Sequence, residues 1–150
     1  MKYEFVNEDT ITSPTGVILT RIRALVDIYS HGVKVGNLGG YLESGNNLSQ
    51  HGTAWVDKGA HVFGSSLVSG HVFITDNARI YGDAHVFGDA RVYGNARVYD
   101  NSKVFGHAMV YGEAKINGET KVYGESRVWG SSRIAQVYQE AQKDVQKIQD

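Results

Sequence analysis

Residues 78–101 read A-R-I-Y-G-D, A-H-V-F-G-D, A-R-V-Y-G-N and A-R-V-Y-D-N, which are four copies of one hexapeptide. Related hexapeptides follow one another without an insertion from residue 54 to residue 131. The first position is usually small, the third is always Val or Ile, the fifth is usually Gly and the sixth is mostly polar. This repeat decides the architecture, because a short fixed period is the sequence signature of a solenoid.

Each hexapeptide predicts a short β-strand followed by a corner. Alternate side chains of a strand point to opposite faces, so positions one and three share one face while positions two and four share the other. Gly followed by Asp or Asn is typical of a turn. Three strands and three corners close one triangular coil, so that residues eighteen apart stack at a spacing of about 4.8 Å.

Position three supplies the predicted core. Each buried Val or Ile contributes on the order of 1.5–3 kcal/mol, and stability grows by stacking because one coil cannot bury its inner face alone. The predicted inward column is Val56, Val62, Val68, Ile74, Ile80, Val86, Val92, Val98, Val104, Val110, Ile116, Val122 and Val128. Both ends of such a solenoid are open sheet edges that need a cover.

The repeat resembles that of the hexapeptide-repeat, left-handed parallel β-helix family, which includes many acyltransferases and the γ-class carbonic anhydrases. The resemblance implies an all-β, three-sided, left-handed solenoid, although general crossover rules favour the right hand. Acyltransferases of the family usually carry a loop that breaks the hexapeptides, whereas this repeat is unbroken. The γ-class enzymes need a closely spaced H-x-x-x-x-H pair, which this sequence lacks.

Three segments resemble the N-terminal module of phage and prophage hexapeptide proteins, the YdcK-like group. They are R-I-R-A-L at residues 21–25, V-K-V-G-N-L-G-G-Y at 33–41 and N-L-S-Q-H-G-T-A-W-V at 47–56. The sequence departs from the group at Tyr41, where Trp is usual, and at Ala54, where Cys is usual. The resemblance implies the fold and a phage origin, and it brings no settled activity with it.

The pattern divides the chain into an N-terminal β cap at residues 1–47, the β-helix at 48–131 and a C-terminal helix at 132–150. Two strands joined by the turn S-P-T-G predict a hairpin that covers the first coil. After residue 131 the apolar residues follow helical spacing; they are Ile134, Val137, Tyr138, Ala141, Val145 and Ile148. This α-helix is expected either to cover the last coil or to bundle with copies from other chains.

The composition excludes several classes of protein. The chain has no cysteine, so neither a disulfide framework nor a Cys-based metal site is possible. The N-terminus lacks an apolar signal core, and no segment is long enough to cross a membrane. We therefore expect a protein of the bacterial host cytoplasm without membrane contact. The formal net charge is −1, so any attraction to anions is local.

The first side of the predicted coil, which begins at residue 54, is rich in large apolar groups on its outer face. We predict that it forms the interface of a homo-oligomer, with a trimer favoured by the habit of the family. The predicted interface residues are Trp55, Phe73, Met109 and Trp129. The alternative is a ladder of stacked aromatic rings that only stiffens the sheet.

The second side carries a column of cations beside aromatic rings, namely Arg79, Arg97 and Lys115 beside Tyr81 and Tyr99. Like charges on neighbouring strands repel, so something must offset them. One interpretation is a solvated face balanced by nearby acids. The other is an anion site, in which a guanidinium binds phosphate and a ring stacks on a base.

In a trimer the second side of one subunit would face the first side of its neighbour. The resulting cleft would have cations on one wall and rings on the other, which suits a phosphate-bearing planar ligand. The predicted ligand-binding residues are Arg79, Tyr81, Arg91, Tyr93, Arg97, Tyr99, Tyr111 and Lys115.

Histidine alternates with a carboxylate along the corner after the third side, at His71, Asp89, His107 and Glu125. The column is interpreted as a solvated corner, with a metal or proton-handling site as the alternative. His71 and His107 are two coils apart, on the order of 10 Å, so a single ion would not bridge them easily. We expect no metal and no cofactor.

The sequence has no nucleophile elbow, phosphate loop or zinc-protease motif. We therefore expect a non-catalytic phage or prophage protein that binds an anionic, nucleotide-like ligand or a host factor. Sequestering a nucleotide signal of a host defence pathway is one example. The alternatives are a structural or assembly β-helix without a small ligand and an acyltransferase of the hexapeptide family.

Overall fold

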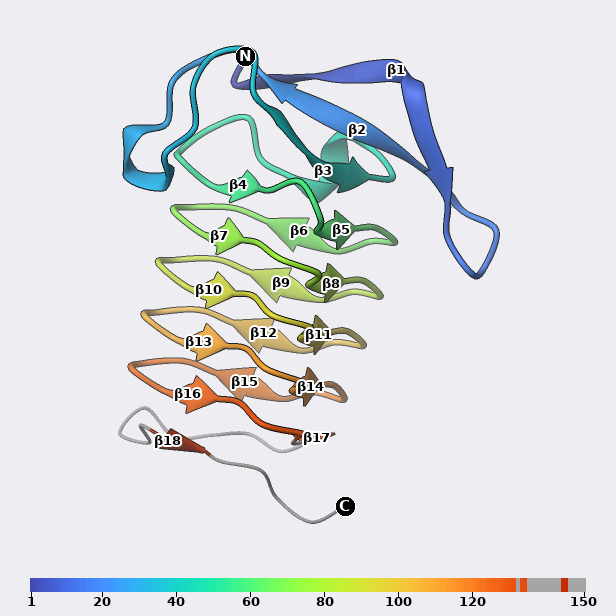
Figure 1. The fold of residues 1–150 in the computed structure, drawn as a ribbon. Coiled ribbons are helices and arrows are strands. Elements are labelled where there is room, and N and C mark those ends of the chain that lie inside the picture. The colour runs from blue at the N-terminus through green and yellow to red at the C-terminus, as the bar shows by residue number, and fades with distance from the viewer. Residues whose placement is uncertain (132, 135–143, 146–150) are drawn as a thin grey trace.

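The chain folds as an all-β parallel solenoid of about five turns. The computed structural model describes residues 1–131, 133–134 and 144–145. The turns stack along one axis, with the N-terminal strands at one end and the last repeats at the other (Figure 1). Within these residues, no helix combines the length and the apolar character needed to cross a lipid bilayer.

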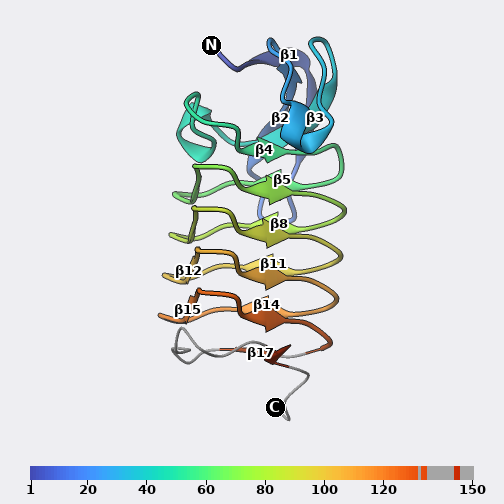
Figure 2. The ribbon, with the colours of Figure 1, turned by 90° about the vertical axis from the view of Figure 1, so that its left-hand side faces the viewer.

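Three sheets form the walls of the solenoid. The first wall contains β4 (Trp55–Val56), β7 (Phe73–Ile74), β10 (Arg91–Val92), β13 (Met109–Val110), β16 (Arg127–Val128) and β18 (Asp144–Val145). The second wall, whose strands are labelled one above another in Figure 2, contains β5 (His61–Val62), β8 (Arg79–Ile80), β11 (Arg97–Val98), β14 (Lys115–Ile116) and β17 (Arg133–Ile134). The third wall contains β6 (Leu67–Val68), β9 (His85–Val86), β12 (Lys103–Val104) and β15 (Lys121–Val122).

The register and the core of the repeat are confirmed. Strands pair in parallel with partners eighteen residues away, so that Arg97 lies between Arg79 and Lys115. Every residue of the predicted inward column has no exposed surface. The small residues at position one, such as Ala78 and Ala96, are buried beside the corners. The hexapeptide alternation therefore places its apolar side chains inside, as the strand period requires.

All corners of the repeat except the first, at Lys58, have a left-handed backbone at the fifth position. At Gly94, where φ is 66°, an added Cβ would lie 2.8 Å from the backbone nitrogen of Gly112 in the next coil. Asp76 and Asp100 take the same conformation, with φ of 56° and 60°. This costs a non-glycine residue about 1 kcal/mol, and each carboxylate offsets it by accepting a backbone N–H of the next coil. Asp76 accepts from Gly94 at 2.9 Å and Asp100 from Gly118 at 2.8 Å.

An N-terminal hairpin caps the first coil, as the sequence predicts. β1 (Tyr3–Thr12) pairs antiparallel with β2 (Ile18–Ala24), and β3 (Leu38–Leu42) pairs antiparallel with β2 and parallel with β5. The second wall therefore continues into the cap, in the order β1-β2-β3-β5-β8. The 3-10 turns η1 (Tyr29–His31) and η2 (Gly45–Asn47) complete the cap.

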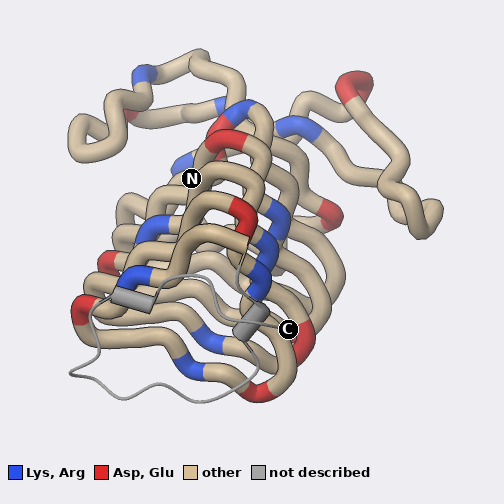
Figure 3. The backbone as a smooth tube through the Cα atoms, turned by 60° about the horizontal axis from the view of Figure 1, so that its bottom comes forward, with Lys and Arg blue, Asp and Glu red and all other residues tan. Residues whose placement is uncertain are grey.

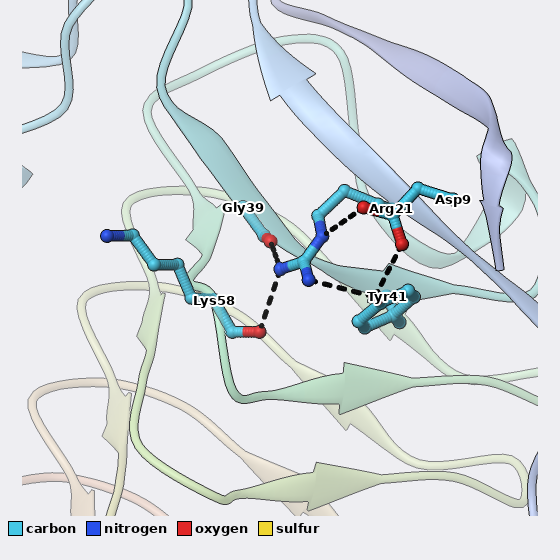
Figure 4. A network of polar contacts seen from close by, with 5 residues as sticks. All are labelled: Asp9, Arg21, Gly39, Tyr41 and Lys58. Atoms are coloured by element: carbon cyan, nitrogen blue, oxygen red, sulfur yellow. Dashed lines mark hydrogen bonds and ion pairs between the residues drawn. The ribbon is translucent and has the colours of Figure 1, made fainter. Parts of the chain in front are cut away.

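Arg21 of β2 ties the cap to the first coil (Figure 4). Its Nε pairs with Asp9 at 3.0 Å, and its Nη1 donates to the carbonyl oxygens of Gly39 at 2.9 Å and Lys58 at 3.3 Å. Its Nη2 donates to the Tyr41 hydroxyl at 2.8 Å, and that hydroxyl donates to Asp9 at 2.7 Å. Tyr41 thus serves as acceptor and donor at once, which a Trp at this position could not do.

The predicted helix at residues 132–150 lies mostly outside the described residues. Its two described parts are the strands β17 and β18, not helix, so the prediction is wrong at residues 133–134 and 144–145. β17 pairs with β14, and β18 pairs with β16. The physical reason is that the last coil presents open strand edges, whose unpaired backbone groups recruit a further strand.

Candidate functional site

Stacked aromatic rings line all three walls at position four of the hexapeptide. On the first wall, Tyr93 stacks on Tyr111 with ring centroids 4.9 Å apart, and Tyr111 stacks on Trp129 at 6.4 Å. The ladder on the second wall is Phe63, Tyr81 and Tyr99, and that on the third is Phe87, Phe105 and Tyr123. The ladder that was the alternative prediction for the first side is therefore formed.

The ring ladder of the first wall ends at Tyr93. The next coil toward the N-terminus has the small side chain of Thr75 in that column, so the ladder has no further ring there. A depression of about 480 Å³ lies at this point, and its lining residues are Phe73, Thr75, Arg91, Tyr93 and Met109. We call it the wall depression.

A second depression lies at the adjacent corner, under the N-terminal cap. It has a volume of about 450 Å³ and is lined by Ser30, His31, Thr53, His71, Asp89 and Arg91. We call it the corner depression. Arg91 lines both depressions. It therefore lies between the aromatic surface of the wall depression and the polar surface of the corner depression.

The chemistry of the wall depression combines ring faces with a cation. Arg91 is exposed, and among the described residues it has no partner in an ion pair. Burial, together with Tyr111, raises the pKa of Tyr93 although Arg127 and Arg91 act in the opposite direction. The Tyr93 hydroxyl is therefore uncharged at neutral pH, and the depression presents positive charge to a ligand.

Among the described side chains, direct ion pairs do not neutralise the cations of the walls. Within the described part of the chain, the pairs closer than 4 Å are Arg21–Asp9, Arg23–Glu4 and His107–Asp89. Lys and Arg follow lines along the stacked strands in Figure 3, whereas several Asp and Glu lie at the corners. The walls thus have local positive charge in a protein whose net charge is −1.

The predicted ligand-binding residues fall on two walls of one chain. Arg91, Tyr93 and Tyr111 belong to the first wall. The others, which are Arg79, Tyr81, Arg97, Tyr99 and Lys115, belong to the second wall (Figure 2). Outward side chains of different walls point in different directions, so a single chain does not bring the two groups together.

Two features of the second wall reduce the repulsion that its cations create. Arg79 is half-buried, and its Nη1 donates to the carbonyl oxygens of Gly59 at 2.8 Å, Asn77 at 3.0 Å and Ala78 at 3.1 Å. Burial, followed by the charges of Arg79 and Arg21, lowers the pKa of His61 to about 4. His61 is therefore neutral at pH 7, and Arg79 is already bound to backbone.

Trp55 is a correction to the predicted oligomer interface. It has no exposed surface, because the cap covers it. A Cβ at Gly39 of β3 would lie 2.7 Å from the Trp55 ring and 2.8 Å from the side chain of Ile22. Trp55 is thus a core residue between cap and first coil. Phe73, Met109 and Trp129 keep part of their surface exposed, so their interface role stays a prediction.

The corner histidines have different partners. Nδ1 of His71 lies 2.6 Å from the hydroxyl oxygen of Thr53, whereas Nδ1 of His107 lies 3.8 Å from a carboxylate oxygen of Asp89. Among the described residues, no three His, Cys, Asp or Glu side chains are grouped so as to hold a metal ion. This corner is thus a set of separate polar contacts.

Three residues of the corner depression were not predicted from the sequence: Ser30, His31 and Thr53. They precede the regular repeat, so no periodicity assigns them to a wall. The only available signal was that the N-terminal segment had to cover the first coil.

No protein-family model matches this chain, and no curated protein is similar to it in sequence. By its fold, the protein is a parallel β-solenoid with a spacing of about 18 residues per turn.

Proposed function

We propose that the protein is a non-catalytic binding protein of phage or prophage origin that acts in the host cytoplasm. In this proposal a left-handed β-helix binds an anionic, nucleotide-like ligand on its first wall. The observation that carries the proposal is the end of the ring ladder at Tyr93, inside a depression that Arg91 also lines. A ring face beside a cation suits a planar group that carries phosphate.

The base of the ligand would continue the ladder beyond Tyr93, in the space that the small Thr75 leaves. Phe73 and Met109 line the same depression and would flank the base with apolar surface. Stacking of a base on an aromatic side chain contributes about 1–3 kcal/mol. Arg91 would hold a phosphate through the two parallel N–H donors that a guanidinium offers. The binding mode needs no nucleophile and no general base.

A homotrimer would complete the site with the second wall of a neighbouring subunit. Arg97 and Lys115 are exposed on that wall, and stacked Tyr81 and Tyr99 run beside them. A bound phosphate between the subunits would offset the repulsion within the cation column. The oligomer and the ligand site are therefore parts of one proposal.

A structural or assembly role is the second candidate function. The ring ladders on all three walls favour it, because stacked rings stiffen a sheet without any ligand. In this role the protein acts by its shape, and a nucleotide has no effect on it.

The ligand site is tested by Arg91→Ala. A charge-assisted hydrogen bond is worth about 1.5–3 kcal/mol, so the affinity for a nucleotide is expected to fall about tenfold or more. Thermal-shift screening of the wild type with ribonucleoside mono-, di- and triphosphates comes first. Titration calorimetry of each nucleotide that raises the melting temperature then compares wild type with variant.

Arg127→Ala is the matched control, because Arg127 is exposed in the same column two coils away and does not line the wall depression. It is expected to keep the affinity of the wild type. Equal losses in both variants, or no nucleotide that stabilises the wild type, would leave the structural role as the better account.

The trimer is tested by the double substitution Phe73→Glu and Met109→Glu. Two carboxylates at an apolar contact are expected to shift the mass measured by light scattering toward that of the monomer. The control, His85→Glu with Lys121→Glu, has the same spacing on the third wall and should keep the mass of the wild type. A wild type that is monomeric at micromolar concentration would contradict the trimer.

A further inference from the structure

The imidazole of His31, in η1, is stacked flat on Phe73 of the first wall. The ring centroids are 4.5 Å apart and the planes differ by 8°. Nε2 of His31 lies 3.1 Å from the backbone carbonyl oxygen of His71. A carbonyl oxygen can only accept, so Nε2 carries the proton. His31 is thus a flat ring held by one stacking contact and one N–H···O bond.

The surroundings of His31 oppose a second proton. Its Nδ1 is buried without a well-formed hydrogen bond among the described residues, so a proton there would be poorly paired. Burial lowers the pKa of His31, and the nearby charges of Arg91 and His71 add to this effect, although hydrogen bonding to the backbone of His71 and Ser30 acts in the opposite direction. The other charged side chains near the ring are Asp89 in the corner depression, and Asp57 and Lys58 in a third depression that His31 also lines.

Only a short turn has to move for this ring to leave Phe73. Ile28 and Val33 exchange two backbone hydrogen bonds, of 2.8 and 3.1 Å, and both side chains are buried in the core. Between these anchors, Tyr29 is 87% exposed. Rearrangement of residues 29–32 can therefore free the imidazole without opening the core.

The wall depression and the corner depression meet at this stacked pair. Phe73 lines the wall depression, His31 lines the corner depression, and Arg91 lines both. Without the imidazole, the face of Phe73 and the carbonyl of His71 would become accessible from the corner depression. The wall would then offer two ring subsites, one on Tyr93 and one on Phe73, with a guanidinium serving both.

We propose that the His31 ring occupies the second of two base subsites, and that the preferred ligand is a dinucleotide, whose two bases are joined through phosphate. η1 is then a gate that the ligand displaces. One base stacks on Tyr93, the other replaces His31 on Phe73 and donates an N–H to the His71 carbonyl, and Arg91 binds the phosphate. The identity of the ligand rests on the proposed function, whereas the gate does not.

The gate has a definite pH dependence. The closed form needs neutral His31, because its surroundings lower the pKa of that ring. Closure is therefore fully favoured above pH 6.5, the ordinary pKa of histidine, which applies to the open form. It weakens as the pH falls from 6.5 toward the lower pKa of the closed form. In the open form the ring reaches solvent and can take up a proton. Acid is therefore expected to open the turn in the absence of any ligand.

The ligand arm of the test compares wild type, His31→Ala and His31→Phe by titration calorimetry. The probes are adenylyl-3′,5′-adenosine, AMP and inorganic pyrophosphate. Removal of a ring that fills the subsite most of the time is expected to tighten dinucleotide binding about tenfold in His31→Ala. Binding of AMP and pyrophosphate should change less than about twofold. His31→Phe keeps a ring on Phe73 and should bind the dinucleotide no more tightly than wild type.

The ligand-free arm follows the ring signals of Phe73 by NMR between pH 7.5 and pH 5. They are expected to shift with the titration of His31 in wild type and to stay constant in His31→Phe. Ring signals that do not depend on pH would overturn the gate. Dinucleotide affinity that is equal in wild type and His31→Ala would overturn the second subsite while leaving the proposed function intact. If AMP and the dinucleotide bind to none of the proteins, the proposed function fails and the NMR result alone decides the gate.

Discussion

Val92→Asp is expected to unfold the solenoid under conditions in which the wild type is folded. Val92 has no exposed surface and lies between Ile74 and Val110 in the inward column. A carboxylate at this point has no polar partner to pair with and no space to reach solvent. The loss of unfolding free energy should be on the order of 4 kcal/mol or more, which places it among the most damaging single substitutions.

The control for Val92→Asp is Tyr93→Ser, one residue further along the chain. Tyr93 is half-exposed, and its loss removes one stacking contact with Tyr111, which is worth about 0.5–1.5 kcal/mol beyond the buried area. Urea denaturation followed by circular dichroism measures both variants. If the two lose the same stability, the inward and outward assignment of the hexapeptide is wrong.

Gly40→Ala is the second substitution for which we expect a large effect, because β3 docks on the first coil at this residue. A Cβ there would collide with the carbonyl oxygen of Ala60 and lie 2.5 Å from that of Asp57. Both obstacles are backbone atoms of the first coil, so a side-chain rotation cannot relieve them. Overpacking of this kind costs about 1–3 kcal/mol or more, and the cap should separate from the solenoid.

The matched control is Gly45→Ala, in the same cap, where an added Cβ meets nothing within 4 Å. Its melting temperature should stay within a few degrees of the wild type, whereas that of Gly40→Ala should fall clearly. Hydrogen exchange of the amides in β3 identifies the part that opens. Normal protection of β3 in Gly40→Ala would show that the cap tolerates the methyl group.

The repeat was predictable because its information is local and periodic. Val or Ile at the third position of each hexapeptide is buried on the inner face of its strand, and Gly at the fifth position matches the left-handed corners. Asp76 and Asp100 break the glycine rule, and their hydrogen bonds to Gly94 and Gly118 became visible only when neighbouring coils were placed together. The helical spacing after residue 131 gave a wrong prediction at β17 and β18, because pairing with an open sheet edge overrides a weak helix propensity.

The candidate site was only partly predictable. Arg91 and Tyr93 follow from the repeat, because positions two and four point outward on a wall whose register is known. Trp55 occupies the same kind of position, yet it is buried because a cap outside the repeat covers it. His31 lies in that cap and follows no period, so its stacking on Phe73 depends on how β2 and β3 place their connecting turn.

The sequence by itself determined the strand register, the inward column, the corners and the outward columns of each wall, because each depends on residues at fixed spacing within the repeat. The tertiary structure alone decided which outward residues are covered by the cap, how the cation column is relieved at His61 and Arg79, and which ring rests on Phe73. The physical reason is that these contacts join the non-repeating N-terminal cap to the first coils, or depend on how deeply the side chains near that junction are buried. No periodic pattern in a chain records contacts of that kind.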